Sequence, residues 1–134
     1  MTVRPATPAD GPALRAIQRA AIAEPVEDLL ELALGDGGPR CLVADDGTPV
    51  GYALALADGD TCYVAELAVA PDHRREGHGT ALLAALADGP ESELRLSVRA
   101  DDDGARAFYR ACGFEVVGRT DRFESEGLVL AREA

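Results

Sequence analysis

The stretch VAPDHRREGHGT, residues 69–80, decides the fold because it joins two different kinds of secondary structure. An apolar run precedes it and an Ala/Leu-rich run follows it, so we expect a strand, a loop and a helix in that order. Gly77 and Gly79 allow positive φ and leave the loop backbone uncovered. The first N–H groups of a helix lack partners within the helix and lie at the positive end of its dipole. With Arg74 and Arg75 beside them, these groups are expected to bind a diphosphate.

Three phosphate-binding loops place glycines at similar spacing. The dinucleotide fingerprint Gly-x-Gly-x-x-Gly is excluded because Leu82 stands where the third glycine belongs. The nucleoside-triphosphate loop requires a lysine after its last glycine, and the chain contains no lysine. The third candidate is the loop that binds the pyrophosphate of coenzyme A. A plain glycine loop between a strand and a helix is the alternative without a ligand.

The loop resembles the Arg/Gln-x-x-Gly-x-Gly/Ala motif of the GNAT superfamily of N-acetyltransferases, with Arg74, Gly77 and Gly79 at the matching positions. A second stretch, DDGARAFYRACGF at residues 102–114, resembles the family's Asn-x-x-Ala-x-x-x-Tyr motif with the Gly-Phe that follows it. Asp102 stands where the family usually has Asn. Two motifs at the right separation are more specific than either alone.

The resemblance covers nearly the whole chain. The opening residues 4–10 are typical of the family, and residues 66–71 resemble its fourth strand. The stretch LSVRA, residues 96–100, is similar to ribosomal-protein alanine acetyltransferases, which usually carry Glu where this chain has Ser97. This departure weakens any transfer of their base or of their protein substrate to this chain.

The resemblance implies acetyl-CoA as co-substrate. It places cofactor contacts on the strand at Leu67, Ala68 and Val69, in the loop at Arg74, Arg75, Glu76, Gly77, His78, Gly79 and Thr80, and at Asp102. The strand would supply backbone hydrogen bonds to the pantetheine and to the thioester oxygen. The loop would bind the pyrophosphate.

Two residues are candidates for proton transfer during amide formation. Tyr109 occupies the position of the family's proton-donating Tyr, and the ordinary pKa of a tyrosine phenol, about 10, is close to that of a thiol. A core tyrosine packed by Phe108 and Phe114 is the structural alternative. Glu66 is the candidate general base, with an exposed strand carboxylate as its alternative and a relayed water as a second source of base.

The remaining segments predict an α/β (α+β) fold. Helices are expected from Asp10, over 26–34 and 80–87, and from Asp102 or Asp103 to Cys112; strands are expected near 3–6, 41–44, 50–57, 61–69, 94–98, 114–118 and 128–130. The unit 61–98 is a parallel βαβ crossover within a meander that is otherwise antiparallel. We therefore expect a GNAT-like mixed, mostly antiparallel sheet of about seven strands with helices on both faces, as a single domain over residues 1–134.

Composition limits the partners. The formal net charge is −11, so we expect no nucleic acid partner, and the acidity favours cationic small molecules or basic peptides. No signal peptide or membrane span is visible, which predicts a cytoplasmic protein that does not bind membranes; a homodimer is left open. Three cysteines and two histidines argue against disulfides and a metal site and favour small buried thiols.

Three functions follow from these observations. The first is transfer of an acetyl group from acetyl-CoA to a primary amine of a small molecule or peptide, by direct attack in a ternary complex. The second is a coenzyme A-binding sensor or structural domain without turnover, which Asp102 and Ser97 keep open. The third is an interaction module with a degenerate loop. Acceptor specificity is expected to come from residues 10–34 and from the loop at 119–127.

Overall fold

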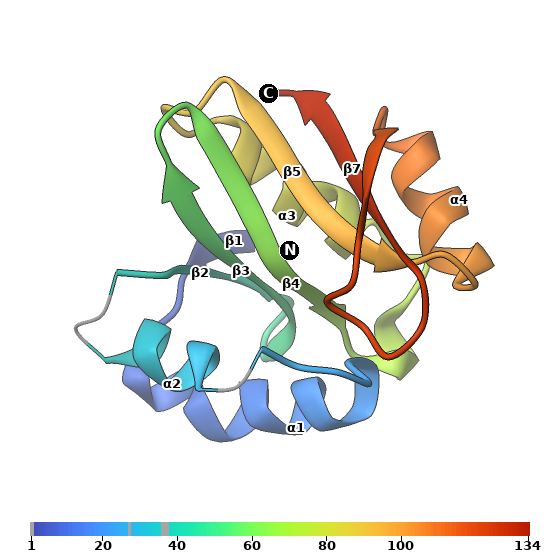
Figure 1. Ribbon diagram of the computed structural model, residues 1–134. Helices are drawn as coiled ribbons and strands as arrows, with labels where there is room; N and C mark the ends of the chain where they lie inside the picture. Colours follow the sequence, from blue (N-terminus) through green and yellow to red (C-terminus); the bar gives the residue numbers. More distant parts are fainter. Residues whose placement is uncertain (1, 27, 36–37) are drawn as a thin grey trace.

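A sheet of seven strands forms the centre of the molecule (Figure 1). The computed structural model describes residues 2–26, 28–35 and 38–134. The strands are β1 (Thr2–Pro5), β2 (Arg40–Asp45), β3 (Pro49–Asp58), β4 (Thr61–Val69), β5 (Glu93–Arg99), β6 (Glu115–Thr120) and β7 (Gly127–Glu133), in the spatial order β1-β2-β3-β4-β5-β7-β6. β4 and β5 run parallel, and the other neighbouring pairs run antiparallel. The expected mixed, mostly antiparallel sheet is confirmed.

Helices cover both faces of this sheet. They are α1 (Gly11–Ala21), α2 (Leu29–Leu34), α3 (His78–Ala87) and α4 (Asp103–Ala111), with short 3-10 turns at Pro8–Asp10 and Pro71–His73. Figure 1 shows α1 and α2 together below the sheet and α3 behind it. In the described part of the chain, no helix is long and apolar enough to cross a membrane.

Each face of the sheet has its own hydrophobic core. Leu14 and Ile17 of α1 pack with Tyr52 and its neighbours in one core, to which α2 also contributes. Leu82 and Leu86 of α3 pack in the other core, against which Phe108 and Tyr109 of α4 are partly buried. Alternation along the strands sends successive side chains to the two cores, which explains why the central strands are apolar on both faces.

A β-bulge in β4 exchanges the two faces of that strand. Leu54 of β3 lies opposite Glu66, whereas the next residue of β3 lies opposite Val64, so Ala65 is the extra residue of the bulge. Because side chains alternate, one extra residue moves every following side chain to the other face. Val64 accordingly packs in the core under α3, while Ala68 packs in the core over α1.

The parallel pairing of β4 with β5 covers only the first half of β4. It runs from Thr61 opposite Glu93 to Val64 opposite Leu96. Beyond this point β4 continues along β3 to Val69, and β5 continues along β7 to Arg99. The two strands therefore separate directly after the last pair, beside the bulge.

Two predicted helix starts differ from the structure, and a third is confirmed in position. α2 begins at Leu29 instead of Val26, because Asp28 adopts a left-handed φ of 62°. α3 begins at His78 instead of Thr80, with Gly77 as its N-cap residue. Asp10 does occupy the N-cap position of α1, but its side chain makes no cap hydrogen bond. The predicted loop at 35–39 includes residues 36–37, which lie outside the described residues.

The Asp10 carboxylate instead joins the N-terminal strand to α1. Arg4 donates two hydrogen bonds of 2.9 Å to its two oxygens, and the Thr7 backbone N–H donates one of 2.8 Å. Asp10 is buried, so these bonds form away from bulk water. The Arg4 guanidinium, opposed in part by burial, lowers the pKa of Asp10 to about 2.

Replacing Asp10 by Asn should lower the free energy of unfolding by about 2 kcal/mol near neutral pH. Because the folded pKa lies below the unfolded value of 3.8, this stabilisation is complete above that value and is lost as the pH falls toward about 2. Urea unfolding near pH 7 and near pH 3 should therefore show the gap between wild type and Asp10→Asn shrinking with acidity. The exposed Asp58→Asn change is the control. Equal stability of Asp10→Asn and wild type at neutral pH would contradict this account.

Candidate active site

The loop between β4 and α3 has the backbone geometry of an anion site. Arg75 and Gly77 adopt positive φ values of 65° and 86°. A left-handed conformation is strained for Arg and costs of order 1 kcal/mol, and such strain concentrates at ligand-binding loops. The backbone N–H groups of residues 78–80 form the first turn of α3, where the helix supplies no acceptor. The loop therefore offers backbone donors beside two guanidinium groups.

A cavity of about 670 Å³ lies over this loop. Its walls come from α1, β4, the loop and α4; they are Ala21, Leu67, Ala68, Val69, His73, Arg74, Arg75, Gly77, His78, Gly79, Thr80, Asp102, Gly104, Ala105, Phe108 and Tyr109. Ten of the predicted cofactor residues therefore line one space. Glu76 is absent from this lining, and its carboxylate lies against His73 and His78 instead.

A second cavity, of about 370 Å³, opens where β4 and β5 have separated. It is lined by residues 64–67 of β4 and 96–99 of β5, by residues 21–24 after α1, and by Arg122 and Phe123. Both segments expected to determine acceptor specificity thus contribute to it. Five residues line both cavities: Ala21, Leu67, Asp102, Ala105 and Tyr109.

Tyr109 lies between the two cavities. Its ring packs edge to face on Phe108 and Phe114, with centroids 5.1 Å and 5.5 Å away, so the expected aromatic packing is present together with access to both cavities. Burial raises the pKa of the Tyr109 phenol well above its usual value, and the nearby Cys112 and Asp102 add to the rise. The hydroxyl therefore keeps its proton throughout the neutral range.

Glu66 is a buried carboxylate held by three donors. It is 4% exposed. Tyr52 Oη donates a hydrogen bond of 2.8 Å and Gln18 Nε2 one of 3.0 Å to Oε1, while Val26 N donates one of 2.8 Å to Oε2. The alternative of an exposed strand carboxylate is wrong, because the bulge turns Glu66 toward the core beside α1. The carboxylate ties β3, α1 and the α1–α2 connection to the wall of the second cavity.

Asp102 caps α4. Its side chain accepts a hydrogen bond of 3.0 Å from the backbone N–H of Ala105. Asn and Asp both serve well at this position, so the departure from the family's Asn preserves the start of the helix. The carboxylate also places a negative charge at the junction of the two cavities.

Three charged residues connect the segments around the second cavity. Arg122 Nη2 donates a hydrogen bond of 3.1 Å to the backbone oxygen of Glu24. Arg99 Nη1 lies 3.7 Å from the Glu24 carboxylate. The loop before β7, the end of β5 and the connection after α1 thereby form one rim around the opening.

The cysteines have no catalytic geometry. All three are free; Cys41 and Cys62 are buried, and Cys112 is half-buried. Burial raises the pKa of the Cys41 thiol to about 12, which keeps it protonated and a poor nucleophile. The prediction of buried thiols is confirmed for two of the three.

Several residues of the site were not predicted from the sequence, because they reach it through contacts between segments far apart along the chain. Gln18, Tyr52, Glu24, Arg99 and Arg122 reach the site from separate elements. Phe108 was expected only to pack, although it also limits the loop: a Cβ built on Gly79 would lie 3.0 Å from its ring. Such contacts leave no local pattern in the sequence.

The fold is that of known N-acetyltransferases. The structure matches the ribosomal-protein-alanine N-acetyltransferase from Brucella melitensis with a TM-score of 0.80 and 26% identity over 100% of both chains. It also matches Ard1 from Thermoplasma volcanium with a TM-score of 0.83 and 24% identity, covering 99% of this chain and 97% of that one.

Residues 12–114 match the acetyltransferase (GNAT) family, and the chain belongs to that family. The family uses acetyl-CoA as co-substrate. A mycothiol acetyltransferase from Clavibacter sepedonicus is 42% identical over 95 residues, which are 68% of this chain but only 31% of that protein. An aminoglycoside N(6')-acetyltransferase type 1 from Stenotrophomonas maltophilia is 33% identical over 91% of both chains.

The Glu66 hydrogen bonds predict a measurable difference between two substitutions. Glu66→Ala leaves the buried Tyr52 hydroxyl and two partly buried N–H donors without an acceptor, and should lower the free energy of unfolding by at least about 2 kcal/mol. Tyr52→Phe removes one donor, leaves the carboxylate with its other two partners, and should cost only about 1 kcal/mol. Urea unfolding of both variants makes the comparison. Equal losses would show that the carboxylate does not hold these elements together.

Proposed function

We propose that this chain is a single N-acetyltransferase domain that transfers an acetyl group from acetyl-CoA to a primary amine of a small molecule or peptide. The observation that carries the proposal is the position of Tyr109, whose side chain lines both the cavity over the glycine loop and the cavity between β4 and β5. A thioester bound in the first cavity and an amine bound in the second would meet beside its hydroxyl. This arrangement supports direct attack in a ternary complex.

In this proposal the cofactor lies along the first cavity. Its pyrophosphate accepts hydrogen bonds from the backbone N–H groups of residues 78–80, with Arg74 and Arg75 balancing its charge. Its pantetheine follows residues 67–69, where β4 has left β5 and its edge is free to donate and accept. The same edge supplies a donor to the thioester oxygen as negative charge develops there.

The amine nitrogen attacks the thioester carbon, the new C–N bond forms, and the C–S bond breaks. The thiolate that leaves takes the Tyr109 proton, and the nitrogen loses its proton to a base. Raising the phenol pKa alone would weaken it as an acid. However, burial raises a phenol pKa and a thiol pKa for the same reason, so a thiolate leaving into this buried space remains a suitable proton acceptor.

Two carboxylates in the acceptor cavity are candidates for the base. Glu66 already accepts three hydrogen bonds, which suits it to hold the cavity wall and to act on the amine through a relayed water. Glu24 is more accessible, with its side chain 33% exposed. Together with Asp102 they give the acceptor cavity three acidic side chains, whereas Arg99 and Arg122 supply two basic ones. The resulting excess of negative charge favours a cationic amine as the acceptor. The likeness to an aminoglycoside acetyltransferase supports the same class, since aminoglycosides carry several amines.

Tyr109→Phe keeps the ring that packs on Phe108 and Phe114 and removes only the hydroxyl. Release of free thiol from acetyl-CoA, followed with a panel of primary amines, should show a kcat lowered roughly 100-fold or more. The affinity for coenzyme A, measured by calorimetry, should be unchanged. Turnover by Tyr109→Phe equal to that of wild type would remove the assigned role of the hydroxyl. A wild-type protein that binds coenzyme A but releases no thiol from acetyl-CoA with any amine of the panel would favour the non-catalytic sensor.

Gly77→Ala tests the phosphate loop against a matched glycine. Gly77 and Gly47 both have positive φ, of 86° and 91°, and neither has an atom within 4 Å of an added Cβ. Each Ala substitution therefore adds backbone strain of about 1 kcal/mol without a clash. Gly77→Ala should weaken coenzyme A binding roughly tenfold, because relief of that strain displaces the phosphate loop, whereas Gly47→Ala should leave the affinity unchanged. Equal affinity in the two variants would place the pyrophosphate elsewhere.

A further inference from the structure

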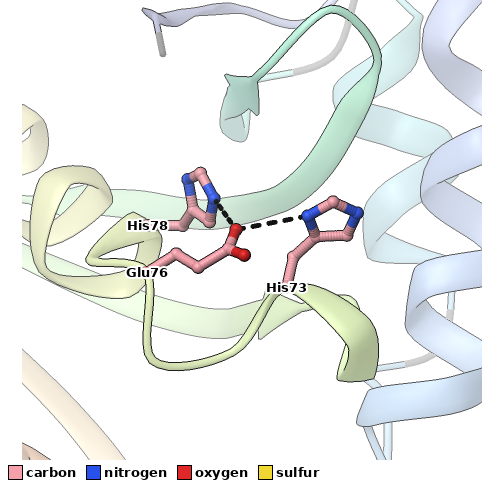
Figure 2. A group of neighbouring side chains, drawn as sticks. All are labelled: His73, Glu76 and His78. Carbon is pink, nitrogen blue, oxygen red and sulfur yellow. Dashed lines mark hydrogen bonds and ion pairs between the residues drawn. The ribbon is translucent and has the colours of Figure 1, made fainter.

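Two histidines that line the cofactor cavity, His73 and His78, meet a glutamate of the phosphate loop, Glu76, that does not line it. Glu76 Oε1 lies 3.3 Å from His73 Nδ1 and 3.0 Å from His78 Nε2 (Figure 2). The three side chains come from the 3-10 turn after β4, from the loop and from the first residue of α3. Each offers one ligand atom, and the three atoms lie within 4.8 Å of one another.

These distances suit a tetrahedral transition-metal ion. Zinc binds histidine nitrogen and carboxylate oxygen at about 2.0–2.2 Å, so two ligand atoms of a tetrahedral site lie about 3.3 Å apart. The two nitrogen–oxygen distances are already close to that value. The third distance is the one between the two histidine nitrogens. His73 and Glu76 are partly exposed, with side-chain exposures of 38% and 47%, so small side-chain rotations can bring this distance to the same length.

The burial of His78 is a second, independent observation. The residue is 3% exposed, and its Nδ1 has no hydrogen-bond partner among the described residues. Its ring interacts through Nε2 with the half-exposed Glu76 carboxylate. A metal bond at Nε2 fixes the ring as the tautomer with its proton on Nδ1, and the burial of the ring limits competition from water for that bond.

Glu76 also explains why a cation could bind here. His78 is the first residue of α3, where the helix dipole favours anions and opposes a positive ion. His73 and His78 bind as neutral ligands, so the Glu76 carboxylate supplies the negative charge of the site. Binding should depend on this carboxylate more than on either ring.

We propose that His73 Nδ1, Glu76 Oε1 and His78 Nε2 bind one divalent ion of the zinc class, with water in the fourth position. The ion links both ends of the segment that carries Arg74, Arg75 and Gly77, and restricts the motion of the phosphate loop. The sequence led to the opposite expectation, because the count of histidines and cysteines leaves out the glutamate between the two histidines.

Zinc and cobalt binding to the whole chain test the proposal. Wild-type protein, freed of metal by chelation, should take up one equivalent of Zn²⁺ in competition with a chromogenic chelator. Co²⁺ should give the visible absorption of a tetrahedral site without the near-ultraviolet band of thiolate ligation. His73→Ala should weaken binding at least roughly tenfold, and Glu76→Gln should weaken it further. Asp72→Asn, an exposed carboxylate in the same turn, is the matched control and should bind as wild type does.

Three results would overturn the proposal. The first is a wild-type protein that takes up no more Zn²⁺ than Glu76→Gln does. The second is that both single variants, His73→Ala and Glu76→Gln, bind Zn²⁺ as tightly as wild type, which would place the ion on other residues. The third is a cobalt spectrum with thiolate bands, which would assign the ion to a cysteine such as Cys112. These readouts are independent of acetyl transfer, so the metal site and the proposed enzyme activity fail or stand separately.

Discussion

The separation of β4 from β5 is the constraint on which the rest of the site depends. Two parallel neighbours normally stay hydrogen-bonded along their whole length. Here the pairing of β4 with β5 ends at Val64 and Leu96, one residue before the bulge at Ala65. The bulge re-aims β4, so that its second half follows β3 while β5 follows β7. A sheet that opened without helices on both sides would expose two apolar faces. Here the two cores support the separated strands from above and below.

Everything with a chemical role lies around this opening. The end of β4 leads into the phosphate loop, α4 begins beside β5, and Tyr109 reaches the junction from α4. The same bulge that frees the edge of β4 turns Glu66 toward Tyr52 and Gln18, where its carboxylate holds the acceptor side in place. Cofactor binding and acceptor positioning are thus two consequences of one irregularity in one strand.

The sequence predicted those parts of the site that are encoded locally. The glycine loop, the strand before it and the start of α4 depend on a few neighbouring residues, and the cavity lining agrees with them at ten of the eleven predicted cofactor positions. The environment of Glu66 was not predictable, because it requires the bulge and partners 48 and 14 residues away along the chain. The direction of Glu76 was missed for a similar reason: its histidine partners meet only once the 3-10 turn and α3 fix their positions. Asp28 interrupted the expected second helix through a left-handed φ that no composition rule required.

The central claim is that coenzyme A binds at the opening between β4 and β5, with its pyrophosphate on the loop before α3. Titration of isotopically labelled protein with coenzyme A, followed by amide NMR, tests this directly. The largest shifts are expected at residues 67–69 and 77–80 and at the first turn of α4, with little change in β1, β2 and the β2–β3 turn. Shifts centred on β1 and β2, with the amides of residues 77–80 unaffected, would contradict the account.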